Sequence, residues 1–287
     1  MAENLYIPEI SGPLRSFMLK VPEEIQQASG IRVMGKLIKS IVFTTDICII
    51  RNVNADAVIA VYPFTPQPII TQTIMSAADI PVFTGVGGGL TQGKRVVNLS
   101  MHAEFQGAIG VVVNAPTSND VVRQVCDTID IPVVVTVISE HEDIESRLEA
   151  GAKIFNVSAA SKTTNVVREI RKRHPDIPII ATGGPTSESI LATIEAGANA
   201  ITWTPPTNGE VFRDIMDAYR EGKPHPEGAD AAPQIPPLKL SELFAGRRNG
   251  GVTQSKGQYD RSVTAAMYRF KFRLWLKATV NSAFGIV

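Results

Sequence analysis

The sequence predicts a (β/α)8 barrel, also called a TIM barrel, in which eight parallel strands form a closed ring and each is followed by a helix. Two observations carry this prediction. Short apolar runs alternate with longer amphipathic segments over residues 40–222, and that alternation is typical of a parallel sheet covered by helices. Several runs also open on a repeated tripeptide: Asp79-Ile-Pro81, Asp130-Ile-Pro132 and Asp176-Ile-Pro178. An open doubly wound sheet is the alternative, and the barrel is favoured because no strand has the character of an edge.

Glycines mark the intervening runs. Gly107, Gly151 and Gly197 each precede an alanine and an apolar run, and they are 44 and 46 residues apart, about two strand–helix units. Glycine just past a helix end supplies the left-handed cap. Proline is tolerated at the first residue of a strand, where it removes no ladder hydrogen bond. The repeat therefore indicates where each unit begins.

The elements follow in order. We expect strands at 41–44, 57–62, 82–85, 109–114, 133–138, 154–158, after Pro178, and at 200–203. Helices are expected at 47–52, from Thr65-Pro66 to about 78, and at 94–105, 118–128 and 164–173, with further helices after Ser139, Gly184 and Thr207. Ser139 with Glu142, and Thr207 with Glu210, have the spacing of capping boxes.

The chain divides into three parts. Residues 1–39 form an N-terminal extension, in which 22–30 suggests a short helix and 31–39 a hairpin that covers the N-terminal mouth of the barrel. The barrel spans 40–222. Residues 223–287 are a proline-rich linker and an amphipathic extension, whose segment 265–279 fits a strand or a helix.

Composition narrows the function classes. The 287 residues are 44% hydrophobic, and 28 basic residues balance 28 acidic ones, so neither nucleic acid nor a membrane surface is an expected partner. Two isolated cysteines favour a reducing, cytoplasmic setting, and the N-terminus does not have the pattern of a signal peptide. The four histidines lack metal-ligand spacing; no metal and no cofactor are expected. A homo-oligomer is expected, with 238–287 as an interface.

In a barrel the reactive groups lie at the C-terminal ends of the strands. Gly183-Gly184 precedes a helix there, and glycine lets the backbone approach an anion at a helix N-terminus. Thr182 and Thr202 end the two neighbouring strands and are further candidate substrate-binding residues. The last strand ends in Thr202-Trp-Thr-Pro-Pro206 and not in a second glycine turn, so half of the usual phosphate site is missing. The alternative is that a tight turn simply needs glycine. Asp46, just past the first strand, is a candidate general base, or a helix N-cap.

A second glycine segment follows the third strand. Residues 88–94 match the G-x-x-x-x-G-K pattern of a P-loop, but Arg95 stands where a hydroxyl would hold Mg²⁺. A nucleotide triphosphatase is therefore not expected. Gly87, Gly88 and Gly89, with Lys94 and with Asn114 from the next strand, are instead candidates to bind an anionic substrate; a purely structural loop is the alternative.

Strands five to eight resemble the phosphate-binding keto-deoxy-phosphogluconate aldolase family, on Ile131-Pro-Val-Val, Gly151-Ala-Lys-Ile-Phe-Asn156 and Ala181-Thr-Gly-Gly184. That family carries a Schiff-base lysine on strand six. Asn156 occupies the equivalent position here, Lys153 lies three residues earlier, and Lys162 in the following loop is the candidate substitute. Asn156 and Lys162 are thus candidate catalytic residues.

Residues 30–220 as a whole are similar to a bacterial barrel family labelled only as hydrolases. The likeness rests on Ala57-Val-Ile-Ala-Val-Tyr-Pro-Phe-Thr-Pro66, 85–89 and Ala200-Ile-Thr-Trp-Thr-Pro-Pro206. The hypothesis is a metabolic enzyme, hydrolase or lyase, acting on a small anionic metabolite, a class that includes phosphorylated metabolites. A non-catalytic barrel that senses such a metabolite is the alternative. A flavin at the glycine turn is a third, which a colourless preparation excludes.

Overall fold

The computed structural model describes residues 8, 10, 12 and 18–225. The predicted linker, the segment 265–279 and the expected interface at 238–287 lie outside the described residues, as does most of the stretch before residue 18. The division of the chain at residues 39 and 222 stays a prediction.

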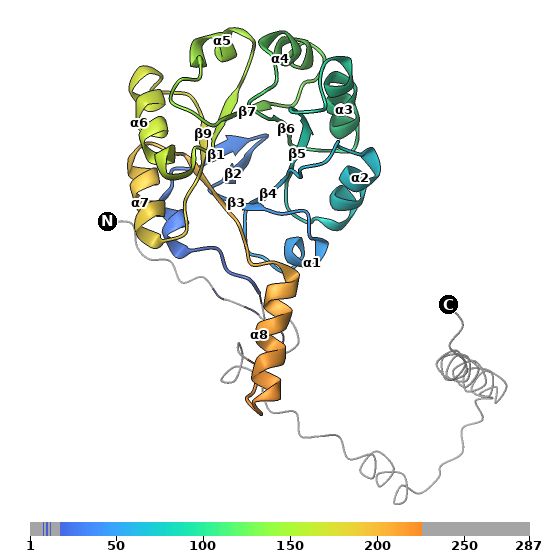
Figure 1. The fold of residues 1–287 in the computed structure, drawn as a ribbon, viewed down its shortest axis with the longest axis vertical. Coiled ribbons are helices and arrows are strands. Elements are labelled where there is room, and N and C mark those ends of the chain that lie inside the picture. The colour runs from blue at the N-terminus through green and yellow to red at the C-terminus, as the bar shows by residue number, and fades with distance from the viewer. Residues whose placement is uncertain (1–7, 9, 11, 13–17, 226–287) are drawn as a thin grey trace, which may run out of the picture. The chain divides into compact units, whose positions relative to one another are not determined.

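The predicted barrel is confirmed. Eight strands form one closed ring in the order β10-β3-β4-β5-β6-β7-β8-β9, and every neighbouring pair is parallel (Figure 1). The open-sheet alternative is therefore wrong. The strands are β3 (Ser40–Phe43), β4 (Ala57–Ala60), β5 (Val82–Gly87), β6 (Gly110–Val113), β7 (Val133–Val137), β8 (Ile154–Val157), β9 (Ile179–Thr182) and β10 (Ala200–Trp203).

A helix follows each strand, as predicted. The helices are α1 (Ile47–Ile50), α2 (Pro68–Ala77), α3 (Lys94–Phe105), α4 (Asn119–Cys126), α5 (Ile144–Glu149), α6 (Thr163–Arg173), α7 (Ser187–Glu195) and α8 (Asn208–Arg220). A short 3-10 turn, η2 (Ala160–Lys162), precedes α6. The capping box of Thr207 with Glu210 at α8 is confirmed.

Two predicted helix starts are wrong. Helix α2 begins at Pro68 with Gln67 as N-cap, not at Thr65, because a residue before proline disfavours helical backbone and Thr65 and Gln67 both precede prolines. Helix α5 is capped by Asp143, whose Oδ1 accepts from the Ser146 amide at 3.1 Å. Glu142 does not close a capping box with Ser139.

Glu142 instead pairs with the buried Arg147, with Nη2 and Oε1 2.8 Å apart. The same guanidinium donates to the carbonyl oxygens of Ala115 and Thr117 and to the side chain of Asn119. A buried guanidinium needs partners for its N–H groups. The Glu142 carboxylate is one of these partners, and it is therefore not used to cap α5. The pair ties the loop after β6 to α5.

The barrel has two hydrophobic cores, because successive side chains along each strand point to opposite faces of the sheet. Inward-facing side chains fill the ring, and the opposite faces of the strands pack against the helices. The inner core contains Ile41, Ala57, Ile59, Phe83, Ile109, Val112, Val134, Ile154, Ile180 and Ala200. Nearly every strand residue is buried, as expected for a parallel sheet covered on both faces.

The predicted N-terminal hairpin is present. Strands β1 (Ile31–Val33) and β2 (Lys36–Ile38) pair antiparallel, and Ile31, Val33 and Ile38 belong to the inner core. The Asp56 carboxylate accepts from the backbone amides of Lys39 and Ser40, both at 2.9 Å. The hairpin therefore closes the N-terminal mouth and leaves the C-terminal mouth for ligands.

The predicted short helix before the hairpin is the 3-10 helix η1 (Glu23–Gln27), whose Ile25 is fully buried. Val21 and Ile25 belong to the same outer core as Val42 and Ile201, and η1 packs against α7. Helix α8, in contrast, has no buried residue. The N-terminal segment thus supplies apolar cover beside the first and last barrel strands.

Candidate functional site

One half of the C-terminal mouth is lined by uncharged polar side chains. Asn156 faces the same way along β8 as the inner-core Ile154, and Thr182 and Thr202 follow Ile180 and Ala200 in the same manner. Thr136 of β7 is the register partner of Asn156. Strand geometry therefore brings three of the predicted site residues, from three neighbouring strands, onto one wall of the mouth.

This wall has spare hydrogen-bonding capacity. Asn156 Nδ2 donates only a long bond of 3.4 Å to Thr136 Oγ1, and its buried Oδ1 has no protein partner in the described residues. The buried Thr202 Oγ1 has none either. Thr182 Oγ1 donates to Ser158 Oγ at 3.3 Å. Because buried polar atoms are ordinarily paired, Asn156 and Thr202 mark a place where an external molecule completes the bonding.

A lysine and two titratable neighbours lie at the rim of the same half. Lys162 ends η2, and its Nζ is 3.0 Å from Glu140 Oε1, with side-chain exposures of 62% and 42%. The hydrogen bond and the charge of Lys162 lower the pKa of Glu140. His141 Nε2 lies 3.8 Å from the same carboxylate oxygen. The candidate catalytic lysine is thus held by an acid and is accessible to solvent.

Asp46 follows β3, the strand that pairs with β10 in the ring. Its Oδ1 accepts from the backbone amides of Cys48 at 2.8 Å and Ile49 at 3.3 Å, so it is the N-cap of α1. The alternative prediction, that Asp46 is a helix N-cap, is confirmed. A general-base role for Asp46 stays a prediction.

The Gly183-Gly184 turn is tight. A Cβ at 183 would lie 2.7 Å from the Ile201 side chain, and Gly184 has φ +83°. Two carboxylates approach the start of α7, because Glu24 hydrogen-bonds Ser187 and Glu188 hydrogen-bonds Thr186, with the pKa of each lowered. These acids offset the positive end of the helix. An anion at this turn would meet negative charge on the outer side.

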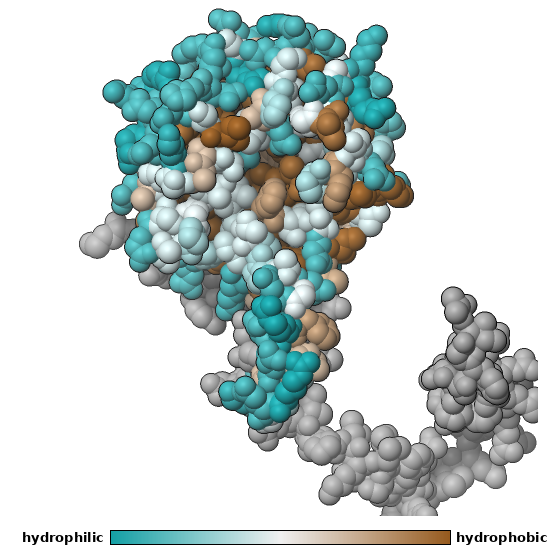
Figure 2. Space-filling model, in the orientation of Figure 1, coloured by the Kyte–Doolittle hydropathy of each residue, from teal (hydrophilic) through white to brown (hydrophobic). Residues whose placement is uncertain are grey.

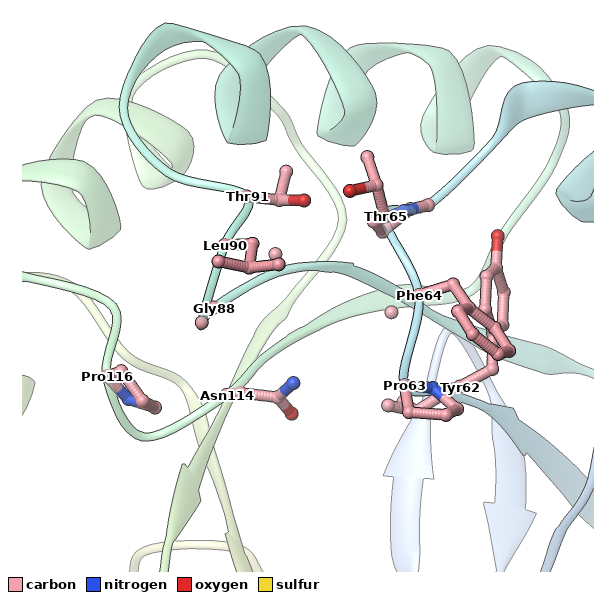
Figure 3. A pocket seen from close by; sticks show the side chains of 14 residues that line it. Tyr62, Pro63, Phe64, Thr65, Gly88, Leu90, Thr91, Asn114 and Pro116 are labelled. Carbon is pink, nitrogen blue, oxygen red and sulfur yellow. The ribbon is translucent and has the colours of Figure 1, made fainter.

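The other half of the mouth is a mostly apolar cavity of about 520 Å³. It lies over the ends of β4, β5 and β6, and Figure 3 shows Asn114 at its base between the loop after β4 and the glycine loop after β5. It is lined by 61–66, Gly85, 87–91, Asn114 and Pro116. The predicted Gly87, Gly88, Gly89 and Asn114 therefore come together.

Lys94, predicted to act with them, does not line this cavity. It is the first residue of α3 and is exposed, as is Arg95. The prediction that the glycine loop binds an anion relied on the positive charge of Lys94. That charge does not lie in the cavity that the loop lines.

Several residues of the mouth were not singled out from the sequence. Phe64 and Leu90 at the apolar cavity, and Thr136 beside Asn156, are among them. Phe64 lies in Tyr62-Pro-Phe-Thr-Pro66, just past the end of a predicted strand, and this position indicates the C-terminal mouth of a barrel. Leu90 lies inside the glycine segment, whose glycines were the predicted binding residues.

The described part of the chain contains no cluster of three or more His, Cys, Asp or Glu residues suited to a metal ion. None of its helices combines the length and apolar character needed to cross a membrane.

Comparison with known sequences gives a similarity over part of the chain. No family model matches the chain. A 4-hydroxy-tetrahydrodipicolinate synthase from Nitrobacter hamburgensis is 27% identical over 141 residues, covering 40% of this chain and 47% of the relative. The chain thus spans about half the length of the curated relative it matches.

Among solved structures, a provisionally assigned phosphonomutase from Burkholderia cenocepacia J2315 superposes with a TM-score of 0.52 and 14% identity, over 67% of this chain and 96% of that one. A dihydrodipicolinate synthase from Bacillus anthracis gives 0.47 and 14%, over 64% and 76%. The chain is a (β/α)8 barrel protein, and the Burkholderia structure is a second example of that fold.

Proposed function

We propose that the protein is a metabolic enzyme of lyase or hydrolase type, acting on a small anionic metabolite at the C-terminal mouth of the barrel. The main support is a pair of buried polar atoms on one wall of that mouth, Asn156 Oδ1 and Thr202 Oγ1. Neither has a hydrogen-bond partner within the described residues. The similarity to a 4-hydroxy-tetrahydrodipicolinate synthase over part of the chain supports lyase chemistry.

In this proposal the anionic group lies against the polar wall. The Thr202 hydroxyl donates a hydrogen bond to it, Asn156 Oδ1 accepts one from a hydroxyl group of the ligand, and Lys162 supplies the positive charge from the rim. Charge-assisted hydrogen bonds of this kind are about twice as strong as neutral ones. Thr182 and Thr202 line one cavity of about 510 Å³ together with Gly184 and Ser187. We place the anionic group on the strand-end side of this cavity, because Glu24 and Glu188 approach its α7 side.

Lys162 then carries the chemistry in the lyase form of the proposal. Its ammonium, held 3.0 Å from Glu140, loses a proton to water, and the free amine adds to a carbonyl carbon of the ligand. The hydroxyl group formed in this addition takes up a proton and leaves as water, and the resulting protonated imine withdraws electrons from the adjacent carbon–carbon bond. Lys162 therefore provides the nucleophile, and Glu140 holds it at the rim.

Borohydride trapping tests this form. The protein is incubated with pyruvate and longer 2-oxo acids, reduced, and mapped by peptide mass spectrometry, with Lys153→Gln as the control and Lys162→Gln as the variant. An adduct that maps to Lys162 and disappears only in Lys162→Gln supports the lyase. Adducts distributed over surface lysines count against it.

Thr202→Val tests the anion site separately. The change removes a hydroxyl without a protein partner and keeps the shape of the side chain, so stability should hold or rise. Binding of inorganic phosphate or pyruvate should weaken about tenfold, the loss of one hydrogen bond to a charged group. Thr71→Val is the matched control, since Thr71 is 8% exposed and Thr202 7%. Equal effects of the two variants would contradict the site.

A non-catalytic sensor of the same ligand remains the second candidate. It is favoured by the polar wall itself, whose Thr136, Asn156, Thr182 and Thr202 include no ionisable side chain. Ligand-dependent melting shifts without turnover and without a trapped adduct would support the sensor. Melting temperatures unmoved by phosphate and by every 2-oxo acid would contradict both candidates.

A further inference from the structure

The apolar half of the mouth offers no charged side chain to an anion. None of the side chains that line the 520 Å³ cavity is an Asp, Glu, Lys, Arg or His. The Gly88 amide donates to the Thr91 carbonyl at 2.9 Å, so this part of the glycine loop closes on itself. Burying a charge without a counter-charge is costly. The cavity is therefore suited to an uncharged group.

Large apolar side chains at its rim are open to water. Leu90 is 100% exposed and Phe64 is 74% exposed, and they come from two different loops on either side of the cavity (Figure 3). Apolar surface in Figure 2 gathers over the centre and over the region where Figure 1 places α2 and α3, whereas the α5–α6 side is mostly hydrophilic. Exposed apolar groups that surround a hollow mark a binding site.

Close backbone packing fixes the shape of the cavity. A Cβ at Gly88 would lie 2.4 Å from the Asn114 Cβ, and one at Gly85 would lie 3.0 Å from the Val61 side chain. On the opposite side, Tyr62 Oη accepts from the Gln67 amide at 2.9 Å and holds the turn that carries Phe64. The hollow is thus built by fixed packing and lies within the usual size range of ligand pockets.

One neutral polar group lies at the base. The Asn114 side chain points toward the segment that carries Tyr62 and Pro63 (Figure 3), and its amide makes no hydrogen bond within the described residues. A free amide offers a donor and an acceptor to a neutral partner such as a carboxamide or a carbonyl. A hydrogen bond to this amide would orient a ligand in the cavity, which apolar contact alone does not do.

We propose that the ligand of this barrel is amphiphilic: an aryl or branched alkyl group occupies the cavity between Phe64 and Leu90, with a neutral carbonyl or amide on Asn114. This inference rests on the proposed function for the other end of the ligand, the anionic group at the polar wall. The substrate class is then a 2-oxo or related organic acid with an apolar side group. Pyruvate itself would leave the cavity unfilled.

Two separate probes test the two ends. Benzamide is uncharged, aromatic and carries a carboxamide, so it reports on the apolar cavity; inorganic phosphate reports on the polar wall. Binding of each is measured by ligand-observed NMR titration on the full chain. Phe64→Ser and Leu90→Ser should each weaken benzamide about tenfold, which corresponds to roughly 50 Å² of lost apolar contact, and should leave phosphate binding unchanged.

Phe105→Ser is the matched control. Phe105 is 75% exposed against 74% for Phe64, ends α3, and does not line the cavity. Benzamide affinity that falls equally in Phe64→Ser and Phe105→Ser, or that is not saturable in the unmodified protein, overturns the proposal. Benzamide binding without phosphate binding supports the cavity and contradicts the anion site. Phosphate binding without benzamide binding supports the anion site and contradicts the proposed role of the cavity.

The two ends are then joined in one ligand. Phenylpyruvate should bind about tenfold or more tightly than pyruvate because its ring leaves water, and Phe64→Ser should remove that preference while pyruvate binding stays the same. Equal affinities for the two acids in the unmodified protein would overturn the amphiphilic ligand.

Discussion

Gly88 and Asn114 approach each other so closely that a Cβ on Gly88 would lie 2.4 Å from the Cβ of Asn114 and 3.1 Å from its backbone nitrogen. Gly88 also has φ +109°, a conformation that side chains disfavour. These two residues join the glycine loop to the end of β6, and the contact sets the floor of the apolar cavity.

Gly88→Ala should therefore be costly. Overpacking and backbone strain together predict a loss of about 3 kcal/mol in the free energy of unfolding, measured by urea denaturation. Gly209→Ala is the control: no atom lies within 4 Å of its would-be Cβ, and it sits inside α8. That change should gain about 0.5 kcal/mol. Equal effects at the two positions would contradict the close packing.

Arg147→Met should destabilise the protein by about 3 to 5 kcal/mol, because it leaves the Glu142 carboxylate without its buried partner. Thermal and urea unfolding measure the loss. The double change Arg147→Met with Glu142→Leu should recover part of it. Arg123→Met, which breaks an exposed pair with Asp120 at 3.3 Å, should cost less than about 1 kcal/mol. A loss at Arg147 as small as that at Arg123 would show that the pair is not structural.

Lys162→Ala should raise the pKa of Glu140 toward its ordinary value. The lysine holds that pKa down in the intact protein, so the stabilising effect of the pair is present above about pH 4.3 and is lost as pH falls further. Carbon-detected NMR of the carboxyl group follows the titration. Lys153→Ala, a change at the other end of β8, should leave the Glu140 titration in place. A Glu140 curve identical in all three proteins would show that the rim pair does not form in solution.

Cys48 should react with a thiol reagent well before Cys126. Cys48 is exposed, whereas Cys126 is partly buried and burial raises the pKa of its thiol. Less of the reactive thiolate is therefore present at neutral pH. Iodoacetamide labelling followed by peptide mass spectrometry gives the order, with Cys48→Ser as the control that removes the fast phase. A fast phase that persists in Cys48→Ser would contradict this order.

The sequence by itself determined the barrel and most of its elements. Strands such as β7 (Val133–Val137) are buried on both faces, so their apolar content shows directly in the residue order. The helix at Lys94–Phe105 was predicted with the boundaries that the structure has. The predicted capping box at Ser139 was wrong because another partner competed for the Glu142 side chain: the buried guanidinium of Arg147, five residues further on.

Only the tertiary structure decided which strand-end residues share a site. Asn156 and Thr202 are 46 positions apart in sequence, and both face the mouth because β8 and β10 flank β9 in the ring. Lys94 follows the glycine loop directly, yet the start of α3 places it outside the cavity. Sequence neighbours diverge at a strand–helix turn, while closure of the ring brings remote strand ends together, and no local pattern records that closure.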